Sequence, residues 1–292
     1  MPLSAAKARP RHELVMRLVQ PLADRGVRWL AATGLNPLWL VLIHGLLGFA
    51  AALLVARGAW LLAALLLQLK TLLDNMDGGL ARVSGRVTLM GRYFDTGADL
   101  LVNLALFAAI ARYGDPLLAL TAFALLTFLL SLDYNAERLY RLERTPPNPP
   151  PNPLPDPAAL PIGAPLPLYL AFKRLYDLFL APQDRFIAVL ERRRFERLSR
   201  TAQASAPLEL RLAWADLFSS ASLVNLGLSS QMFVLGLCLV LGQPFWYVYA
   251  VFLQSLYVLC VQLLREARFR AYLRGMNGLV KTNPGVNETE KP

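Results

Sequence analysis

Four aspartates in this sequence have the residue type and the spacing expected of a catalytic or metal-binding site. They are Asp74, Asp77, Asp95 and Asp99, and they lie at the ends of two apolar segments. An ionised carboxylate within a membrane is energetically unfavourable, so these residues are expected to have a function. On helices that turn by about 100° per residue, Asp74 and Asp77 share one face, and Asp95 and Asp99 share a face of the next helix. The two pairs can therefore converge.

Carboxylates without a His or Cys partner suggest a site for hard cations. Such oxygen ligands suit Mg²⁺, Mn²⁺ or Ca²⁺, and cations between the carboxylates would relieve their repulsion. A two-metal site of this kind binds the attacking and leaving oxygens in phosphoryl transfer. Gly78, Ala81 and Gly91 leave space for a nucleotide, while Arg82 and Arg92 could bind its phosphates.

The stretch from Asp74 to Asp99 resembles the signature of the CDP-alcohol phosphotransferase (CDP-alcohol phosphatidyltransferase) family, which comprises integral membrane enzymes of phospholipid synthesis. Every specified position of the pattern D-x2-D-G-x2-A-R-x8-G-x3-D-x3-D agrees. The resemblance implies that Asp74, Asp77 and Asp95 hold two Mg²⁺ ions, for which Mn²⁺ could substitute. It also implies that Asp99 contacts metal and acts as the catalytic base, and that the small residues admit CDP.

Other interpretations of these charges remain open. The aspartates could be helix-end carboxylates that pair with Arg82, Arg86 and Arg92. Lys70, one helical turn before the first aspartate, could neutralise the carboxylates, meet an anionic substrate or extend to the membrane interface. His44 lies within an apolar segment, where we expect it to pack between helices and bond to a backbone carbonyl rather than act as a ligand.

Composition identifies an integral membrane protein. The 292 residues are 55% hydrophobic, and the mean hydropathy is +0.41. Six spans are predicted, near residues 38–56, 59–80, 93–112, 116–134, 221–241 and 245–264. The two cysteines lie in apolar runs and support neither a disulfide framework nor a zinc site. Only Arg57 and Arg112 fall in loops on one side, so the positive-inside rule places both termini and the aspartates at the cytoplasmic face. The net charge of +10 then requires no nucleic-acid partner.

The predicted fold is an all-α six-transmembrane-helix bundle, with an N-terminal juxtamembrane amphipathic helix and a cytoplasmic insertion between spans four and five. The predicted regions are a tail and an interfacial helix broken near Pro21 (1–35), spans one to four (36–143), a Pro-rich linker with interfacial helices (144–218), spans five and six (219–274) and a loose polar tail (275–292). Tyr134, Asn135 and Arg138 are candidates to shape an acceptor pocket, although a solvated helix end explains them slightly better.

The resemblance implies transfer of a phosphatidyl group from CDP-diacylglycerol to a hydroxyl acceptor, with release of CMP. The alternative within the family is transfer of a phospho-alcohol from a CDP-alcohol to diacylglycerol. A membrane cation transporter is the alternative from another class, but no internal repeat is evident. A catalytically inactive relative would be expected to have lost an aspartate. The sequence identifies neither the acceptor alcohol nor the oligomeric state, although family members are often homodimers.

Overall fold

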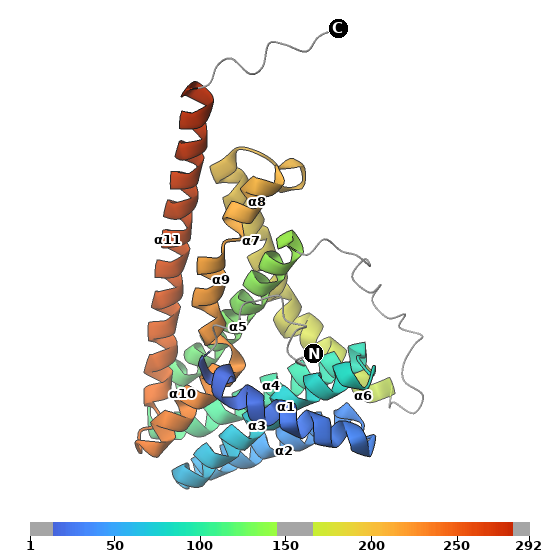
Figure 1. The fold of residues 1–292 in the computed structure, drawn as a ribbon. Coiled ribbons are helices and arrows are strands. Elements are labelled where there is room, and N and C mark those ends of the chain that lie inside the picture. The colour runs from blue at the N-terminus through green and yellow to red at the C-terminus, as the bar shows by residue number, and fades with distance from the viewer. Residues whose placement is uncertain (1–13, 145–165, 283–292) are drawn as a thin grey trace.

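The computed structural model describes residues 14–144 and 166–282, and this part of the chain is helical without β-strands. Its main helices are α1 (Leu14–Thr33), α2 (Pro37–Ala56), α3 (Trp60–Val83), α4 (Leu89–Ile110), α5 (Pro116–Arg144), α6 (Leu166–Leu175), α7 (Ala181–Ser199), α8 (Leu208–Trp214), α9 (Leu217–Leu223), α10 (Leu228–Val240) and α11 (Trp246–Thr282). Short helical turns join them at η2 (Ala111–Tyr113), η3 (Tyr176–Leu180, a π-helix), η4 (Gln203–Ser205) and η5 (Val224–Leu226). Helices α1 to α4 gather at one end of the molecule, and α7, α8 and the C-terminal half of α11 form the other end (Figure 1).

Four helical segments are long and apolar enough to cross a membrane. They are Pro37–Ala56, Met90–Tyr113, Pro116–Arg144 and Trp246–Met276. Segments Leu208–Leu226 and Leu228–Val240 meet at a bend of 44° and pass the same test as a pair, which gives up to five spans. Helix α3 is of similar length, but each stretch of 18 residues within it carries at least three charged side chains, among them Lys70, Asp74 and Asp77. The described residues therefore contain four or five candidate spans.

Small residues bring α2 close to both α3 and α4. A Cβ atom at Gly48 of α2 would lie 2.5 Å from Val102 Cγ1 of α4, so only glycine fits at this contact. Ala51, Ala63 and Ala64 are buried in the same core. Helices in membranes associate largely through such close backbone approach. This packing sets the distance between the helices that carry the aspartates.

Helix α1 runs without a break from Leu14 to Thr33, so the predicted break near Pro21 is wrong. Proline removes one backbone hydrogen bond. Ala23 and Val27 are nevertheless fully buried against Met76 and Leu80 of α3, and this packing holds α1 helical on both sides of the proline. Leucines and a tryptophan on the other face stay exposed, as expected of an interfacial helix.

The insertion after α5 packs against the four-helix end through its first helices. Phe172 of α6 meets Phe94 of α4 with ring centroids 4.8 Å apart, and a Cβ atom at Gly97 would lie 2.2 Å from Phe172 Cδ1. Ile187 of α7 is 1% exposed. The predicted Pro-rich linker lies outside the described residues, which resume at Leu166, where α6 begins.

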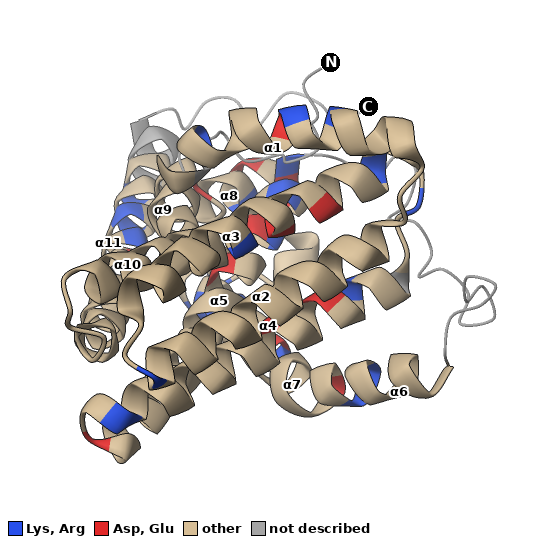
Figure 2. Ribbon diagram, turned by 90° about the horizontal axis from the view of Figure 1, so that it is seen from below, with Lys and Arg blue, Asp and Glu red and all other residues tan. Residues whose placement is uncertain are grey.

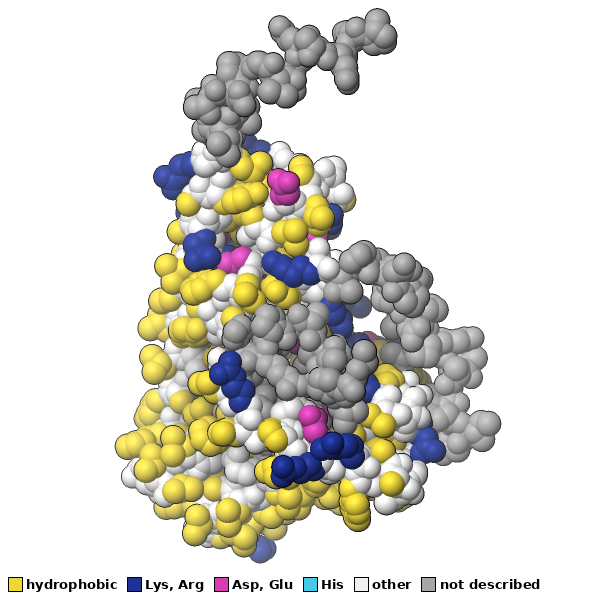
Figure 3. Space-filling view, viewed as in Figure 1, with side chains coloured by type: hydrophobic (Ala, Val, Ile, Leu, Met, Phe, Trp, Pro, Cys, Tyr) yellow, Lys and Arg dark blue, Asp and Glu magenta, His cyan; other side chains and the backbone are white. Residues whose placement is uncertain are grey.

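Helix α11 extends well beyond a single membrane crossing. Exposed leucines follow its first half at Leu253, Leu256, Leu259 and Leu263. Hydrophobic side chains also cover much of the lower part of the face drawn in Figure 3. The second half packs against α7 and α8 around Phe195, Trp214 and Phe269. The helix continues to Thr282, so the prediction placed the start of the loose tail, at residue 275, too early.

Candidate active site

A tight turn between α3 and α4 brings the two aspartate pairs to the same level. Gly85 has φ of +66°, a conformation that glycine adopts without strain. Thr88 then caps α4, because its side-chain oxygen accepts a hydrogen bond of 3.0 Å from the Gly91 backbone N–H. The chain reverses here and α2 packs against both α3 and α4, so that side chains of the C-terminal half of α3 can reach those of the N-terminal half of α4. In Figure 2 the acidic positions of these two helices lie in the middle of the helix bundle.

Three of the four aspartates converge with a histidine. One ligand atom from each of His44, Asp74, Asp77 and Asp95 lies within 4.8 Å of the others. His44 Nε2 is 2.9 Å from Asp77 Oδ2, 3.7 Å from Asp74 Oδ1 and 3.6 Å from Asp95 Oδ1. The expectation that His44 bonds to a backbone carbonyl is therefore wrong. One signal could have revealed it: His44 lies one helical turn before Gly48, which faces α4.

The fourth aspartate has a different partner. Asp99 Oδ1 lies 2.7 Å from Lys70 Nζ, and Asp74 Oδ1 lies 3.9 Å from the same nitrogen. Lys70 is 1% exposed, so it does not extend to the interface but neutralises carboxylates inside the helix packet. Asp99 does not belong to the converging cluster. Its predicted contact with metal and its role as base remain predictions.

The alternative interpretation, in which the aspartates pair with arginines, is not observed among the described residues. Arg86 donates instead to the Gly34 backbone carbonyl at 3.1 Å. Arg92 donates to the Tyr134 hydroxyl, and its guanidinium carbon lies 5.5 Å from the centroid of that ring. Arg82 lies over Gly78, where an added Cβ atom would be 3.3 Å from Arg82 Nη1. These arginines are not engaged with the carboxylates.

The cluster has the properties of a cation site. Three carboxylates face one another, and Asp95 Oδ1 is buried without a hydrogen-bond partner. A buried carboxylate oxygen normally has a partner. A divalent cation would supply it and would offset the concentrated negative charge, because carboxylate oxygens suit Mg²⁺ and Mn²⁺. The donor set therefore fits a divalent metal ion.

A cavity of about 350 Å³ opens beside Asp95 and Asp99. Its walls come from α4, from α5 and from the insertion, and Tyr134 and Arg92 are among the residues that line it. Tyr134, one of the candidates for an acceptor pocket, thus lines a cavity next to the aspartates, and its contact with an acceptor remains a prediction. Asn135 contributes indirectly, since its Nδ2 donates to Asp184 Oδ1 at 3.1 Å. Arg138 is not among the lining residues.

The small residues and arginines that were predicted to admit a nucleotide lie around the turn between α3 and α4. Gly78 and Ala81 are half-buried, and Arg82 is exposed next to them. A Cβ atom at Gly91 would lie 3.2 Å from Thr88 Oγ1, so this glycine also serves the cap of α4. Nucleotide binding by Gly78, Ala81, Arg82, Gly91 and Arg92 remains a prediction.

Comparison with known proteins supports this interpretation of the site. Residues 35–151 match the family model described as CDP-alcohol phosphatidyltransferase. No curated protein and no solved structure matches the chain. The matched segment includes α2 to α5 and contains His44, Lys70 and every aspartate of the site. Over residues 35–151, the chain is therefore similar to the CDP-alcohol phosphatidyltransferase family, and this similarity supports a membrane transferase of phospholipid biosynthesis.

Proposed function

We propose that this protein transfers the phosphatidyl group of CDP-diacylglycerol to a hydroxyl acceptor and releases CMP. The observation that carries the proposal is the convergence of Asp74, Asp77 and Asp95, with Asp99 one helical turn further along α4 at the edge of a cavity. An apolar donor tail, a charged diphosphate and a polar acceptor must meet in this reaction. A carboxylate cluster between membrane helices and beside a cavity suits all three.

Asp74, Asp77 and Asp95 would hold two Mg²⁺ ions, and His44 would orient Asp77 by donating from Nε2 at 2.9 Å. The ions would supply charge neutralisation at the diphosphate and at the leaving CMP. Arg82 and Arg92 would bind phosphate oxygens, since guanidinium groups form strong charge-assisted hydrogen bonds. Gly78, Ala81 and Gly91 would leave space for the cytidine.

Asp99 would act as the general base. The acceptor hydroxyl gives its proton to Asp99 while its oxygen forms a bond to the phosphorus atom that carries the diacylglycerol. The bond from this phosphorus to the oxygen of CMP breaks at the same time. Lys70 holds Asp99 through the 2.7 Å contact to Oδ1, so the other carboxylate oxygen can turn toward the cavity.

We further propose that the chain crosses the membrane six times. Helix α3 would be the additional span, since its first half is apolar and its charged half packs against α1 and α2. The bent pair Leu208–Val240 would be the fifth. Arg57 and Arg112 lie at the connections between spans on one side. The positive-inside rule then places the aspartates at the cytoplasmic face.

The test supplies purified protein in lipid micelles with Mg²⁺ and one of two donor systems. The first contains CDP-diacylglycerol and a panel of hydroxyl acceptors, and the second contains CDP-alcohols and diacylglycerol. Release of CMP and the mass of the new lipid are measured together. We expect product only in the first system and loss of product in excess EDTA. Product in the second system alone, or full turnover in EDTA, would overturn the proposal.

A further inference from the structure

The insertion contributes one wall of the cavity beside the aspartates. Tyr176 and Leu180 of η3 and Asp184 of α7 line it, together with Asp95 and Asp99 of α4. The first three residues lie outside the segment that matches the family model. This wall is therefore a feature of the present chain that the family match does not explain.

Asp184 is a carboxylate without a neutralising partner at this wall. It accepts 3.1 Å hydrogen bonds from Asn135 Nδ2 and from the Tyr176 hydroxyl. Burial, together with the charge of Asp184, raises the pKa of Tyr176 to about 12, so this hydroxyl stays protonated and donates. Both donors are neutral, and no Lys, Arg or His among residues 14–144 and 166–282 forms an ion pair with Asp184. Its negative charge is thus available to a ligand.

The other charged groups at the cavity have partners or assigned roles. Asp99 pairs with Lys70, and Asp95 belongs to the histidine and aspartate cluster. Arg92, which also lines the cavity, donates to the Tyr134 hydroxyl and is assigned to the phosphates of the nucleotide. Behind the same wall, Gln183 Nε2 donates to Thr127 Oγ1 at 3.2 Å, and its carbonyl oxygen is buried without a partner. The wall is rich in acceptors, which favours a ligand rich in donors.

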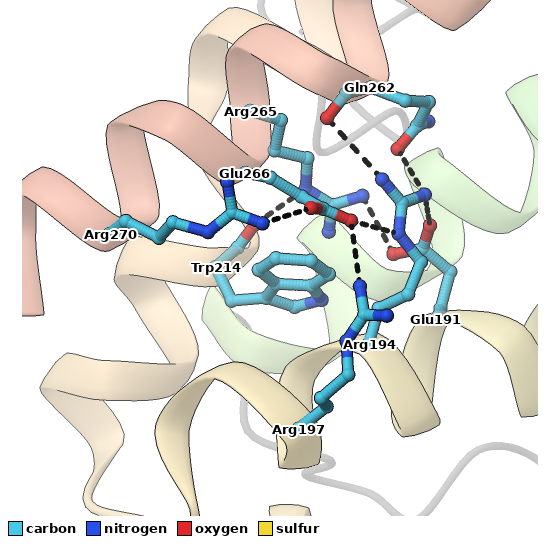
Figure 4. Close-up of polar contacts among 8 residues, drawn as sticks. All are labelled: Glu191, Arg194, Arg197, Trp214, Gln262, Arg265, Glu266 and Arg270. Carbon is cyan, nitrogen blue, oxygen red and sulfur yellow. Dashed lines mark hydrogen bonds and ion pairs between the residues drawn. The ribbon is translucent and has the colours of Figure 1, made fainter.

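Helix α7, which carries Asp184, is held firmly at its other end. Arg194 Nε lies 2.7 Å from Glu266 Oε1, and Arg265 Nη1 lies 2.6 Å from Glu191 Oε2 (Figure 4). The Arg265 guanidinium also stacks over Trp214 at 4.0 Å from the ring centroid. These ion pairs join α7 to α11. A wall anchored in this way can present a carboxylate at a constant position.

We propose that Asp184 determines acceptor specificity by binding an ammonium group, so that the acceptor is an amino alcohol. The inference rests on the proposed function, because it assigns the cavity to the acceptor. An ammonium group donates up to three hydrogen bonds and neutralises the carboxylate. It would also place the hydroxyl of a small amino alcohol near Asp99. An acceptor that carries only negative charge would be repelled by Asp184.

The test compares matched acceptors that differ in the ammonium group. Ethanolamine is paired with ethylene glycol and serine with glycerate, and glycerol 3-phosphate and inositol complete the panel. CMP release from CDP-diacylglycerol is measured for wild type, Asp184→Asn and Asp184→Glu. Asp177→Asn is the control, because Asp177 lies on the same segment but pairs with Lys173 away from the cavity. The KM for each acceptor and for CDP-diacylglycerol is determined separately.

We expect wild type to prefer the ammonium member of each pair, and Asp184→Asn to raise its KM by roughly 10- to 100-fold, as for loss of a charge-assisted hydrogen bond. The KM for CDP-diacylglycerol should not change, Asp184→Glu should keep the preference, and Asp177→Asn should behave as wild type. A wild-type preference for ammonium-free acceptors, or equal effects of Asp184→Asn on both members of a pair, would overturn the inference but leave the proposed function intact. Absence of CMP release with every acceptor would overturn both. Should Asp184→Asn fail to fold, the acceptor preferences of wild type and of the Asp184→Glu variant still test whether Asp184 binds the ammonium group.

Discussion

Replacement of Lys70 by methionine tests whether the buried lysine neutralises the site. Lys70 is 1% exposed, and its Nζ atom lies 2.7 Å from Asp99 Oδ1 and 3.9 Å from Asp74 Oδ1. Methionine has a similar length but no charge, so Lys70→Met leaves two carboxylates without their cation. Removing one member of a buried ion pair is strongly destabilising, because the other charge stays buried without a partner.

The magnitude follows from the burial of both side chains. Asp99 retains 17% side-chain exposure, so we take the low end of the range for buried pairs and expect the free energy of unfolding to fall by about 3 kcal/mol. The double variant Lys70→Met/Asp99→Asn should recover most of this loss, since the remaining amide carries no charge. The two substitutions should therefore be far from additive.

The assay is unfolding by sodium dodecyl sulfate in mixed micelles without added metal, followed by circular dichroism. Lys173→Met is the matched control, because Lys173 forms a 2.5 Å pair with Asp177 on an exposed surface, where such pairs contribute little. We expect no measurable change for this control. Additive effects of the two substitutions in the double variant, or equal stability of Lys70→Met and wild type, would refute the neutralising role of Lys70.

Three further predictions concern the proposed reaction. Asp99→Asn should keep most of the affinity for CDP-diacylglycerol but lose turnover by roughly 10²-fold or more, as expected for a general base. Binding and initial rates are measured on one preparation. Survival of the rate with loss of binding would make Asp99 a ligand only. Asp77→Asn should shift the Mg²⁺ dependence of turnover to higher concentration while the protein stays folded, and an unchanged Mg²⁺ titration would contradict its role as a ligand. Gly78→Val should lower CMP affinity in calorimetry without unfolding the protein, because the new side chain meets only the flexible end of Arg82; normal affinity would mean that this glycine does not border the nucleotide.

The spacing of residues within single helices could be predicted from the sequence. Asp74 with Asp77, and Asp95 with Asp99, share a helix face because positions three or four residues apart always do. The turn at Gly85 reverses the chain between the two pairs, but their convergence also depends on the packing of α2 against both α3 and α4. The all-helical fold and the membrane character of the chain follow from apolar composition and segment length in the same local way.

Contacts between distant segments depended on the tertiary structure. His44 reaches Asp77 only because α2 packs closely against its neighbours at glycine positions. A histidine one turn before a glycine in an apolar run hints at close packing but does not identify the partner. The continuity of α1 through Pro21 likewise depends on burial of Ala23 and Val27 against α3. In both cases packing between helices outweighs the local preference of the residue.

The position of Asp184 shows most clearly that contacts between distant segments could not be predicted from the sequence. It lies far from the aspartate motif in the sequence, in an insertion whose pattern indicated only an amphipathic helix. Its place at the cavity depends on aromatic contacts of α6 with α4, on the hydrogen bond to Asn135 and on the ion pairs that join α7 to α11. Local spacing determines which side chains share a helix face, whereas the approach of separate helices depends on the complementary shapes and charges of all their surfaces, which only the folded chain brings together.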